Sequence, residues 1–255
     1  MATTQLQMVN RLLRRLREDT VTGTTDNTYS QLLAEIVADC YEEVLDEHKW
    51  ESLKHLVHVD ISAGTVEYRL DAKVNNGGNI RNSDTRVPTV DSELLFFNGD
   101  MPEVYMYDDD SDDSPSPLTF LSPEAFRYQK SLDRDSTETE PYYFTIFRKA
   151  DATNGRRLFM EIYPSPTASR VIELMFWTKP ARLASDGTTD NVNFLIPERP
   201  VFQLAYMYAL NERGEELGEP GNLAERRYIE SLAAETEKEI DAYVKDNKID
   251  VVVFD

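Results

Sequence analysis

The chain has 255 residues, of which 40% are hydrophobic, so it is long enough for one large domain or two small ones. No stretch approaches the roughly 20 apolar residues of a membrane-spanning helix, and the first residues lack the apolar segment of a signal peptide. The formal net charge of −20 excludes a protein that wraps DNA by neutralising its phosphates. Two uses of this charge remain: solubility, or a surface past which nucleic acid slides without binding.

Two helices are predicted before residue 50. Apolar residues recur at helical spacing over residues 3–19 and again over residues 29–49. Thr28 and Gln31 have the spacing of a capping box at the start of the second helix. The only cysteine, Cys40, falls on the apolar stripe, so we interpret it as a packing residue. A chain with one cysteine forms no internal disulfide, which fits assembly in a reducing cytoplasm.

Four arginines gather on the first predicted helix, which is unusual in so acidic a chain. Arg11, Arg14, Arg15 and Arg17 lie on and around the side away from its apolar stripe. Three interpretations are open. The arginines form a solvated helix face, they contact an acidic surface of this protein or of a neighbouring copy, or they contact DNA.

Short strands follow the second helix. Residues 55–61 and 65–70 alternate apolar and polar side chains, and Ala63-Gly64 between them predicts a hairpin. Residues 93–97 and 104–107 are two further strands. Asn98-Gly99 between them is a strong hairpin signal.

A second group of strands precedes residue 180. Residues 122–126 have the pattern of a helix start, with a helix to about residue 133. Residues 142–148, 157–163 and 170–178 then form three strands with short links. Because short links favour antiparallel neighbours, we predict that these three strands form an antiparallel meander.

Two groups of residues resemble metal sites, but neither has the required pattern. Residues 108–113 are acidic, yet no glycine and no twelfth-position glutamate complete a calcium loop, so we interpret them as a solvated loop. His55 and His58 lie where strand signals begin, and no cysteine is near to complete a ligand set. No glycine-rich phosphate loop and no nucleophile elbow occurs. We therefore predict that the protein is not an enzyme and has no catalytic residue, metal or cofactor.

The C-terminal part is predicted to be helical. One helix begins near Pro197, a turn-rich segment follows at 214–221, and a last helix extends to about residue 248. Residues 249–255 are apolar and β-branched, and an exposed strand of this kind needs a partner. We predict that this tail docks on its own sheet or on a neighbouring protein, through the residues Val251, Val252, Val253 and Phe254.

These elements predict the fold class α+β. Neither terminal group of helices can bury its apolar stripe alone, so residues 1–53 and 195–248 should form one antiparallel helical bundle, the adaptor body. Residues 54–194 should form an inserted antiparallel β-rich domain. Within it, residues 71–140 are an elaboration whose contacts the sequence leaves open. Residues 249–255 form the docking tail.

Part of the sequence resembles a known family. Residues 158–166 read LFMEIYPSP, residues 171–180 read VIELMFWTKP, and Leu195-Ile-Pro197 precedes a helix containing residues 206–209, YMYA. Together with the helices before Trp50, this pattern resembles the head–tail adaptor (connector) proteins of tailed bacteriophages. It is most similar in style to tail tubular protein A and the tail accessory factor of short-tailed phages.

The resemblance implies a structural virion protein in the neck or tail, assembled in the host cytoplasm. Such adaptors form a ring, typically of about twelve copies, below the portal. The implied partners are further copies of the chain, the portal protein, and tail hub, nozzle or fibre proteins. DNA passes through the channel without specific binding, and the tail with Val251 to Phe254 reaches the portal. Arg11, Arg14, Arg15 and Arg17 would then meet acidic neighbours.

Two other functions stay open from the sequence. One is an acidic protein-binding module of a bacterial cell with no virion role. The other is a hydrolase or nuclease with dispersed carboxylates, which would bind magnesium or manganese through a buried acid cluster.

Overall fold

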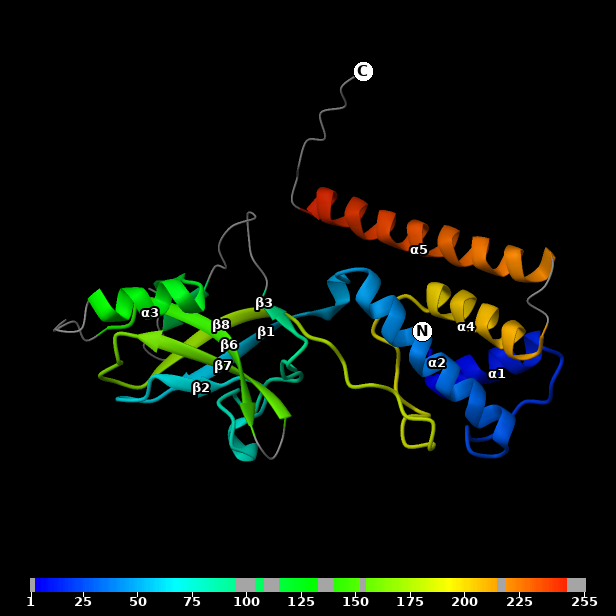
Figure 1. Ribbon diagram of the computed structural model, residues 1–255, viewed down its shortest axis with the longest axis horizontal. Coiled ribbons are helices and arrows are strands. Elements are labelled where there is room, and N and C mark those ends of the chain that lie inside the picture. The colour runs from blue at the N-terminus through cyan, green and yellow to red at the C-terminus, as the bar shows by residue number, and fades with distance from the viewer. Residues whose placement is uncertain are drawn as a thin grey trace, which may run out of the picture. The chain divides into compact units, whose positions relative to one another are not determined.

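A computed structural model divides the chain into two compact units (Figure 1). The helical unit consists of Met1–Ser52 and Ala181–Asp255, and the β unit consists of Leu53–Pro180. These units are defined by their internal contacts, whereas a domain is a part of the chain that could fold by itself. The domain boundaries expected from the sequence therefore stay a prediction. The structure describes residues 3–94, 104–107, 115–132, 140–151, 155–214 and 219–246.

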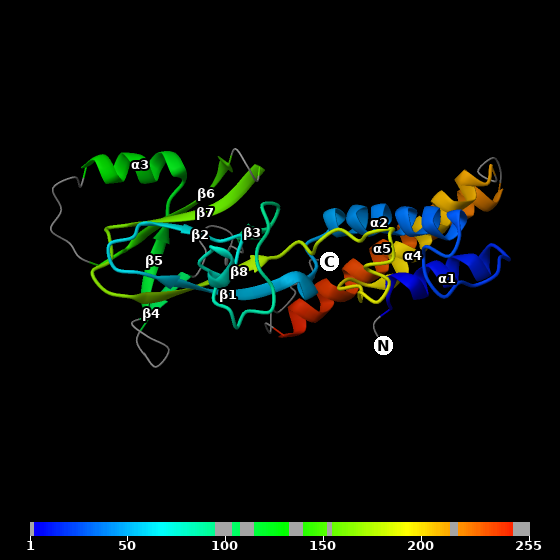
Figure 2. The ribbon, with the colours of Figure 1, turned by 90° about the horizontal axis from the view of Figure 1, so that it is seen from below.

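The helical unit has four α-helices in its described residues. They are α1 (Gln5–Arg15), α2 (Thr28–Glu47), α4 (Glu198–Glu212) and α5 (Glu219–Asp246). The helix α2 packs against both α1 and α4, and α5 lies along α4 (Figures 1 and 2). The helices α1, α2 and α4 pack through buried apolar side chains, among them Met8, Leu12, Val37, Val44 and Leu204. None of the helices in the described part of the chain is long and apolar enough to cross a membrane.

The start of α2 differs by one residue from the predicted capping box. Asn27, not Thr28, is the cap, because its backbone is extended at φ −151° while Thr28 is already helical. The Asn27 side-chain oxygen accepts a hydrogen bond from the Ser30 N–H at 2.8 Å, and Ser30 Oγ accepts from the Asn27 N–H at 3.2 Å. The predicted pair of Thr28 and Gln31 is therefore wrong, although the predicted helix is confirmed.

The β unit is built on an eight-stranded mixed sheet with the order β1-β8-β4-β5-β6-β7-β2, and β3 pairs with β8 beside this path. All strand pairs are antiparallel except β5 with β6, which is parallel. The strands are β1 (Lys54–Ile61), β2 (Glu67–Arg69), β3 (Glu93–Leu94), β4 (Val104–Tyr107), β5 (Ser116–Phe120), β6 (Tyr143–Asp151), β7 (Gly155–Tyr163) and β8 (Arg170–Trp177).

The sheet closes nearly completely on itself. Ile80 forms isolated bridges with Val59 of β1 and with Lys73 beyond β2, so it links the two ends of the strand path. Inward side chains from both ends of the path fill one core, among them Val57, Tyr68 and Leu174. The helix α3 (Pro123–Leu132) covers β6 (Figure 2). Two short 3₁₀ turns, η1 (Glu51–Leu53) and η2 (Val74–Asn76), complete the described elements.

This architecture contradicts the predicted fold class. A helical bundle with an inserted antiparallel β-rich domain is wrong, because the main body is a nearly closed, barrel-like mixed sheet, accompanied by five α-helices in the described residues. The prediction took the helical ends as the body and the strands as an addition. Burial shows a different balance, since the sheet has a large core of its own.

The error in strand pairing has a physical cause. The turn at Gly64 exists, with φ 76° and a hydrogen bond from the Thr65 N–H to the Ser62 carbonyl. The predicted hairpin is wrong, however, because β1 pairs with β8 and β2 pairs with β7. In the predicted meander, the pairing of β6 with β7 is confirmed and that of β7 with β8 is wrong. Short links allow a chain to pass between facing parts of a curled sheet, where both parts share one core.

The strands β3 and β4 also do not form the predicted hairpin. Both lie antiparallel to β8, with Leu94 opposite Phe176 and Met106 opposite Ile172. They therefore run parallel to each other along one strand. Asn98 and Gly99, which signalled the hairpin, lie outside the described residues.

Candidate interaction surface

The arginines of α1 project away from the core of the helical unit. Met8 and Leu12 are fully buried, whereas Arg11, Arg14 and Arg15 are exposed. This separation follows from the helical period, since Met8 and Leu12 are four residues apart and the arginines occupy the remaining positions. One side of α1 therefore anchors the helix and the other presents charge.

Two aromatic side chains of α4 support two of these arginines. The guanidinium carbon of Arg11 lies 4.2 Å from the ring centre of Phe202, and that of Arg15 lies 5.5 Å from the ring centre of Tyr206. The two rings stack at 6.2 Å with an angle of 4° between their planes. Each cation–π contact contributes about 0.5–1 kcal/mol at an exposed site. The rings therefore hold both arginines in place before any partner arrives.

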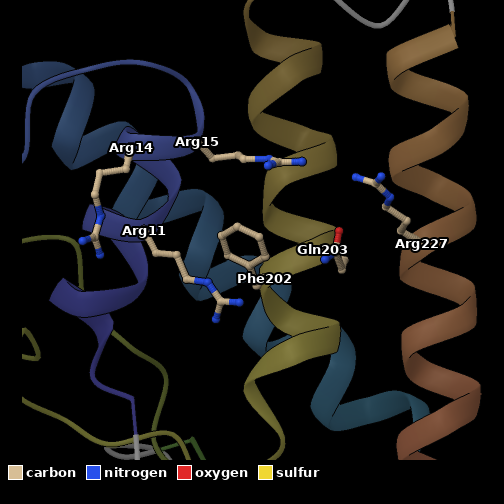
Figure 3. A pocket seen from close by; sticks show the side chains of 6 residues that line it. All are labelled: Arg11, Arg14, Arg15, Phe202, Gln203 and Arg227. Atoms are coloured by element: carbon tan, nitrogen blue, oxygen red, sulfur yellow. The ribbon is translucent and has the colours of Figure 1, made fainter.

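Arg11, Arg15 and Phe202 also line a hollow between three helices. Figure 3 shows α1, α4 and α5 side by side, with Phe202 and Gln203 between the α1 arginines and Arg227. This hollow has a volume of about 440 Å³. A second hollow beside it is lined by Arg14, Arg15, Arg17, Tyr206 and Arg213, among others. We call the six cations of these two hollows the arginine surface: Arg11, Arg14, Arg15, Arg17, Arg213 and Arg227.

Only part of the arginine surface is neutralised within the chain. Arg11 forms an ion pair with Glu198 at 3.2 Å, and Arg213 forms one with Glu18 at 3.3 Å. In the described ranges, no carboxylate pairs with Arg14, Arg15, Arg17 or Arg227. Among the described residues, four cations of this surface therefore have no carboxylate partner, in a chain whose net charge is −20.

Arg17 has an unusual backbone conformation just beyond α1. Its φ of 63° lies in the left-handed region, where it is the only residue other than glycine in the described chain. The Glu18 N–H donates to the Leu13 carbonyl at 2.9 Å and the Arg17 N–H donates to the Arg14 carbonyl at 3.3 Å. This is a Schellman motif with arginine at the position that glycine usually takes. A left-handed residue with a side chain costs about 1 kcal/mol, so local stability does not explain this arginine.

A second charged surface lies on α2. Glu43 and Glu47 are exposed and four residues apart, and no cation pairs with either among the residues that the structure describes. Tyr208 of α4 donates a hydrogen bond to Glu43 at 3.3 Å. Burial, together with Glu47 and Glu43, raises the pKa of Tyr228 of α5 to about 12. We call these four residues the acidic surface.

Cys40 lies in the core of α2 near this surface. It is fully buried, and burial together with Glu43 and Asp39 raises the pKa of its thiol. A thiol kept protonated in an apolar environment is chemically inert. The interpretation of Cys40 as a packing residue is therefore confirmed.

The histidines of the β unit do not form a joint site. His55 and His58 both lie in β1, and their odd spacing places them on opposite faces of the strand. His58 lies between Asp84 and Glu173, each 3.1 Å from one ring nitrogen, while His55 Nε2 accepts from the Arg86 N–H. Within the described residues, no group of three or more histidine, cysteine or acidic side chains could hold a metal ion.

Two predicted features lie outside the described residues. They are the acidic loop 108–113 and the proposed docking tail with Val251, Val252, Val253 and Phe254. The docking role of the tail therefore stays a prediction.

Comparison with known families identifies the chain. The model of the SU10 adaptor protein family matches residues 3–247, so the chain belongs to this family. It is a structural adaptor of a bacteriophage, which is not an enzyme class, and a component of the virion that interacts with other head or tail proteins. The predicted phage adaptor is confirmed, and the family match does not support the alternative of a bacterial module with no virion role. The closer resemblance to tail tubular protein A stays a prediction. No curated protein matches the chain.

Proposed function

We propose that this adaptor forms a ring between the portal and the tail of the phage and extends the DNA channel. The observation that carries the proposal is the family match over residues 3–247, which covers both the helical and the β unit. A ring of identical copies needs surfaces that bind protein. The arginine surface supports this requirement, because four of its cations have no carboxylate partner in the described chain.

The charge of the chain supports a channel role. At −20 per copy, a ring of about twelve copies carries a strongly negative field, which repels the phosphates of passing DNA. DNA then moves through the channel without specific binding. The portal on one side and tail hub, nozzle or fibre proteins on the other are the protein partners. The adaptor acts at the virion neck after assembly in the host cytoplasm.

The test is electron microscopy of purified portal rings mixed with the adaptor. We expect an added layer of density with the rotational symmetry of a closed ring. Portal rings that stay unchanged at saturating adaptor concentration would contradict the proposal. The catalytic alternative is checked in the same preparation, because a nuclease would shorten linear DNA in the presence of magnesium.

The tail is tested separately by deleting residues 249–255. We expect the truncated chain to keep the thermal midpoint of the full chain and to lose the added layer on the portal, because Val251 to Phe254 supply the apolar contact. If the truncated chain still adds its layer to the portal, the tail is not the docking segment, and the proposed ring is unaffected.

A further inference from the structure

The arginine surface and the acidic surface lie on different sides of one helix. Phe202 and Tyr206 of α4 support the arginines, whereas Tyr208 of α4 contacts Glu43. Two residues along a helix correspond to a rotation of about 200°, so Tyr206 and Tyr208 point in nearly opposite directions. In Figure 3 the arginines face the viewer, and α2, which carries Glu43, packs behind α4.

From this arrangement we infer that copies of the adaptor associate head to tail, with the arginine surface of one copy bound to the acidic surface of the next. The inference rests on the proposed ring and names its two contact surfaces. Two different surfaces on one chain form a heterologous contact, which closes into a ring when the rotation between copies allows it. A symmetric dimer through the arginine surface is disfavoured, because like charges would face each other.

The two surfaces are chemically complementary. Arg14 and Arg15 present guanidinium groups, which bind carboxylates through two parallel hydrogen bonds. Glu43 and Glu47 present exposed carboxylates one helical turn apart, which is the spacing of Arg11 and Arg15 on α1. Arg15 is already held by the ring of Tyr206, so less side-chain entropy is lost when it binds a partner.

The acidic surface extends further along α2. Arg182 forms ion pairs with both Asp39 and Glu42, so these three side chains together keep one negative charge. With Glu43 and Glu47, the outer side of α2 carries about three net negative charges. The four arginines of a second copy that have no carboxylate partner in the described residues would neutralise this negative charge.

DNA is the competing partner for the arginines. Guanidinium groups bind phosphates as well as carboxylates, but a chain with net charge −20 repels the DNA backbone as it approaches. The helical unit itself offers the exposed carboxylates of Glu43 and Glu47. A second copy of the chain is therefore the partner that the charges favour, and DNA binding becomes an outcome of the test.

The experiment reverses the charge of each surface. One variant carries Arg14→Glu and Arg15→Glu, and the other carries Glu43→Arg and Glu47→Arg. All four side chains are exposed, so we expect both variants to keep the circular dichroism spectrum and the cooperative unfolding of the wild type. The thermal midpoint should fall slightly, because one variant loses the Arg15–Tyr206 contact and the other the Tyr208–Glu43 hydrogen bond. In sedimentation and on portal rings, we expect each variant alone to associate at least 100-fold more weakly, because like charges now face each other.

Mixing the two variants is the decisive step. In an alternating ring every contact again joins an acidic to a basic surface, so the mixture should restore the ring layer. A chain carrying all four substitutions should restore it as well. As a matched control, Arg226→Glu changes an arginine outside the arginine surface that already pairs with Glu230 within its own helix, and should leave association unchanged.

Each result has a distinct meaning. If either reversed variant assembles like the wild type, or if the mixture of two folded variants fails to assemble, the inference is wrong. If assembly is kept while binding to a DNA duplex is lost, the arginines bind DNA instead. If the wild-type adaptor adds no layer to portal rings, the proposed function itself fails. If all variants add the layer, the proposed function stands and only the contact surfaces are wrong.

Discussion

The β unit and the helical unit differ in how their charged side chains are paired. In the β unit, His58 lies between Asp84 and Glu173, and several basic side chains have carboxylate partners, such as Lys149 with Glu67 at 2.9 Å. In the helical unit, four arginines of one surface have none in the described residues. Charged side chains that are paired within the chain stabilise the fold, whereas the arginines without a carboxylate partner are available to bind another protein.

Secondary structure explains the difference. Strand pairing places residues of distant sequence opposite each other, and the register of β1 with β8 brings His58 directly opposite Glu173. On α1 the neighbours one turn apart are both arginines, Arg11 and Arg15. Like charges at this spacing destabilise a helix by about 0.2–0.5 kcal/mol. This repulsion offsets part of the about 0.5–1 kcal/mol that each cation–π contact with Phe202 and Tyr206 contributes.

The largest expected effect is on Asp84 in the β unit. Asp84 is almost fully buried and accepts the backbone N–H of His58 at 2.9 Å. Asp84→Ala leaves this donor unpaired, so we expect the free energy of unfolding to fall by about 2–3 kcal/mol. Urea denaturation measures the loss. Asp84→Asn keeps an acceptor oxygen and should lose clearly less. Equal losses in both variants would show that charge, not the hydrogen bond, matters, and either variant should keep its ring association while folded.

Arg11 combines both kinds of charge and should show an intermediate effect. It pairs with Glu198 and covers the ring of Phe202. Arg11→Ala should destabilise the chain by about 1 kcal/mol, the sum of an exposed ion pair and a cation–π contact. It should also weaken association, because the surface loses a cation. Arg226→Ala, which removes an exposed pair within α5, is the control. A stability loss in Arg11→Ala with unchanged association would assign Arg11 to the fold alone.

The sequence predicts local structure better than strand pairing. The helices α1 to α5 and the strands of the β unit other than β5 follow from periodicity and turn residues, which act over a few positions, whereas β5 (Ser116–Phe120) was not predicted. Which strands pair depends on competition between sheet edges: β7 takes β2 rather than β8 on its second edge, although only six residues separate β7 from β8. Which pairing wins depends on how much apolar surface is buried across the whole core, so a short stretch of sequence does not predict it.

The sequence indicates the arginines of the interaction surface but not the aromatic side chains of α4 that contact them. Arg11, Arg14, Arg15 and Arg17 stand out by charge alone. Phe202 and Tyr206 could have been found, because their spacing of four residues matches that of Arg11 and Arg15, but no local rule brings α4 beside α1. Not every large apolar side chain of the helical unit is buried, since Tyr208 and Ile240 are 37% and 57% exposed. Side chains of this kind would be covered by a neighbouring copy in the proposed ring.

Arg17 should separate stability from association. Arg17→Gly removes the strain of a side chain in the left-handed region, so we expect stability to rise by about 0.5–1 kcal/mol. Association should weaken at the same time, since one open cation is lost. Thermal unfolding and sedimentation measure the two effects on the same samples. Arg17→Asn is the control, because asparagine tolerates this conformation but carries no charge. A glycine variant that is more stable and also associates as well as the wild type would remove Arg17 from the arginine surface.

The smallest effect is expected from His55 in the β unit. Burial, followed by the nearby Arg86 charge, lowers the pKa of His55, and its Nε2 accepts the Arg86 N–H, which requires the neutral ring. Near pH 6.5, His55 therefore binds a proton in the unfolded chain but stays neutral in the folded chain. The contribution of neutral His55 is complete above pH 6.5 and is lost as the pH falls through 6.5 toward the lowered pKa. His55→Gln keeps an acceptor without titrating. We therefore expect the thermal midpoint of the wild type to fall further between pH 7.5 and pH 5.5 than that of the glutamine variant. Parallel midpoints over this range would show that His55 titrates alike in both states.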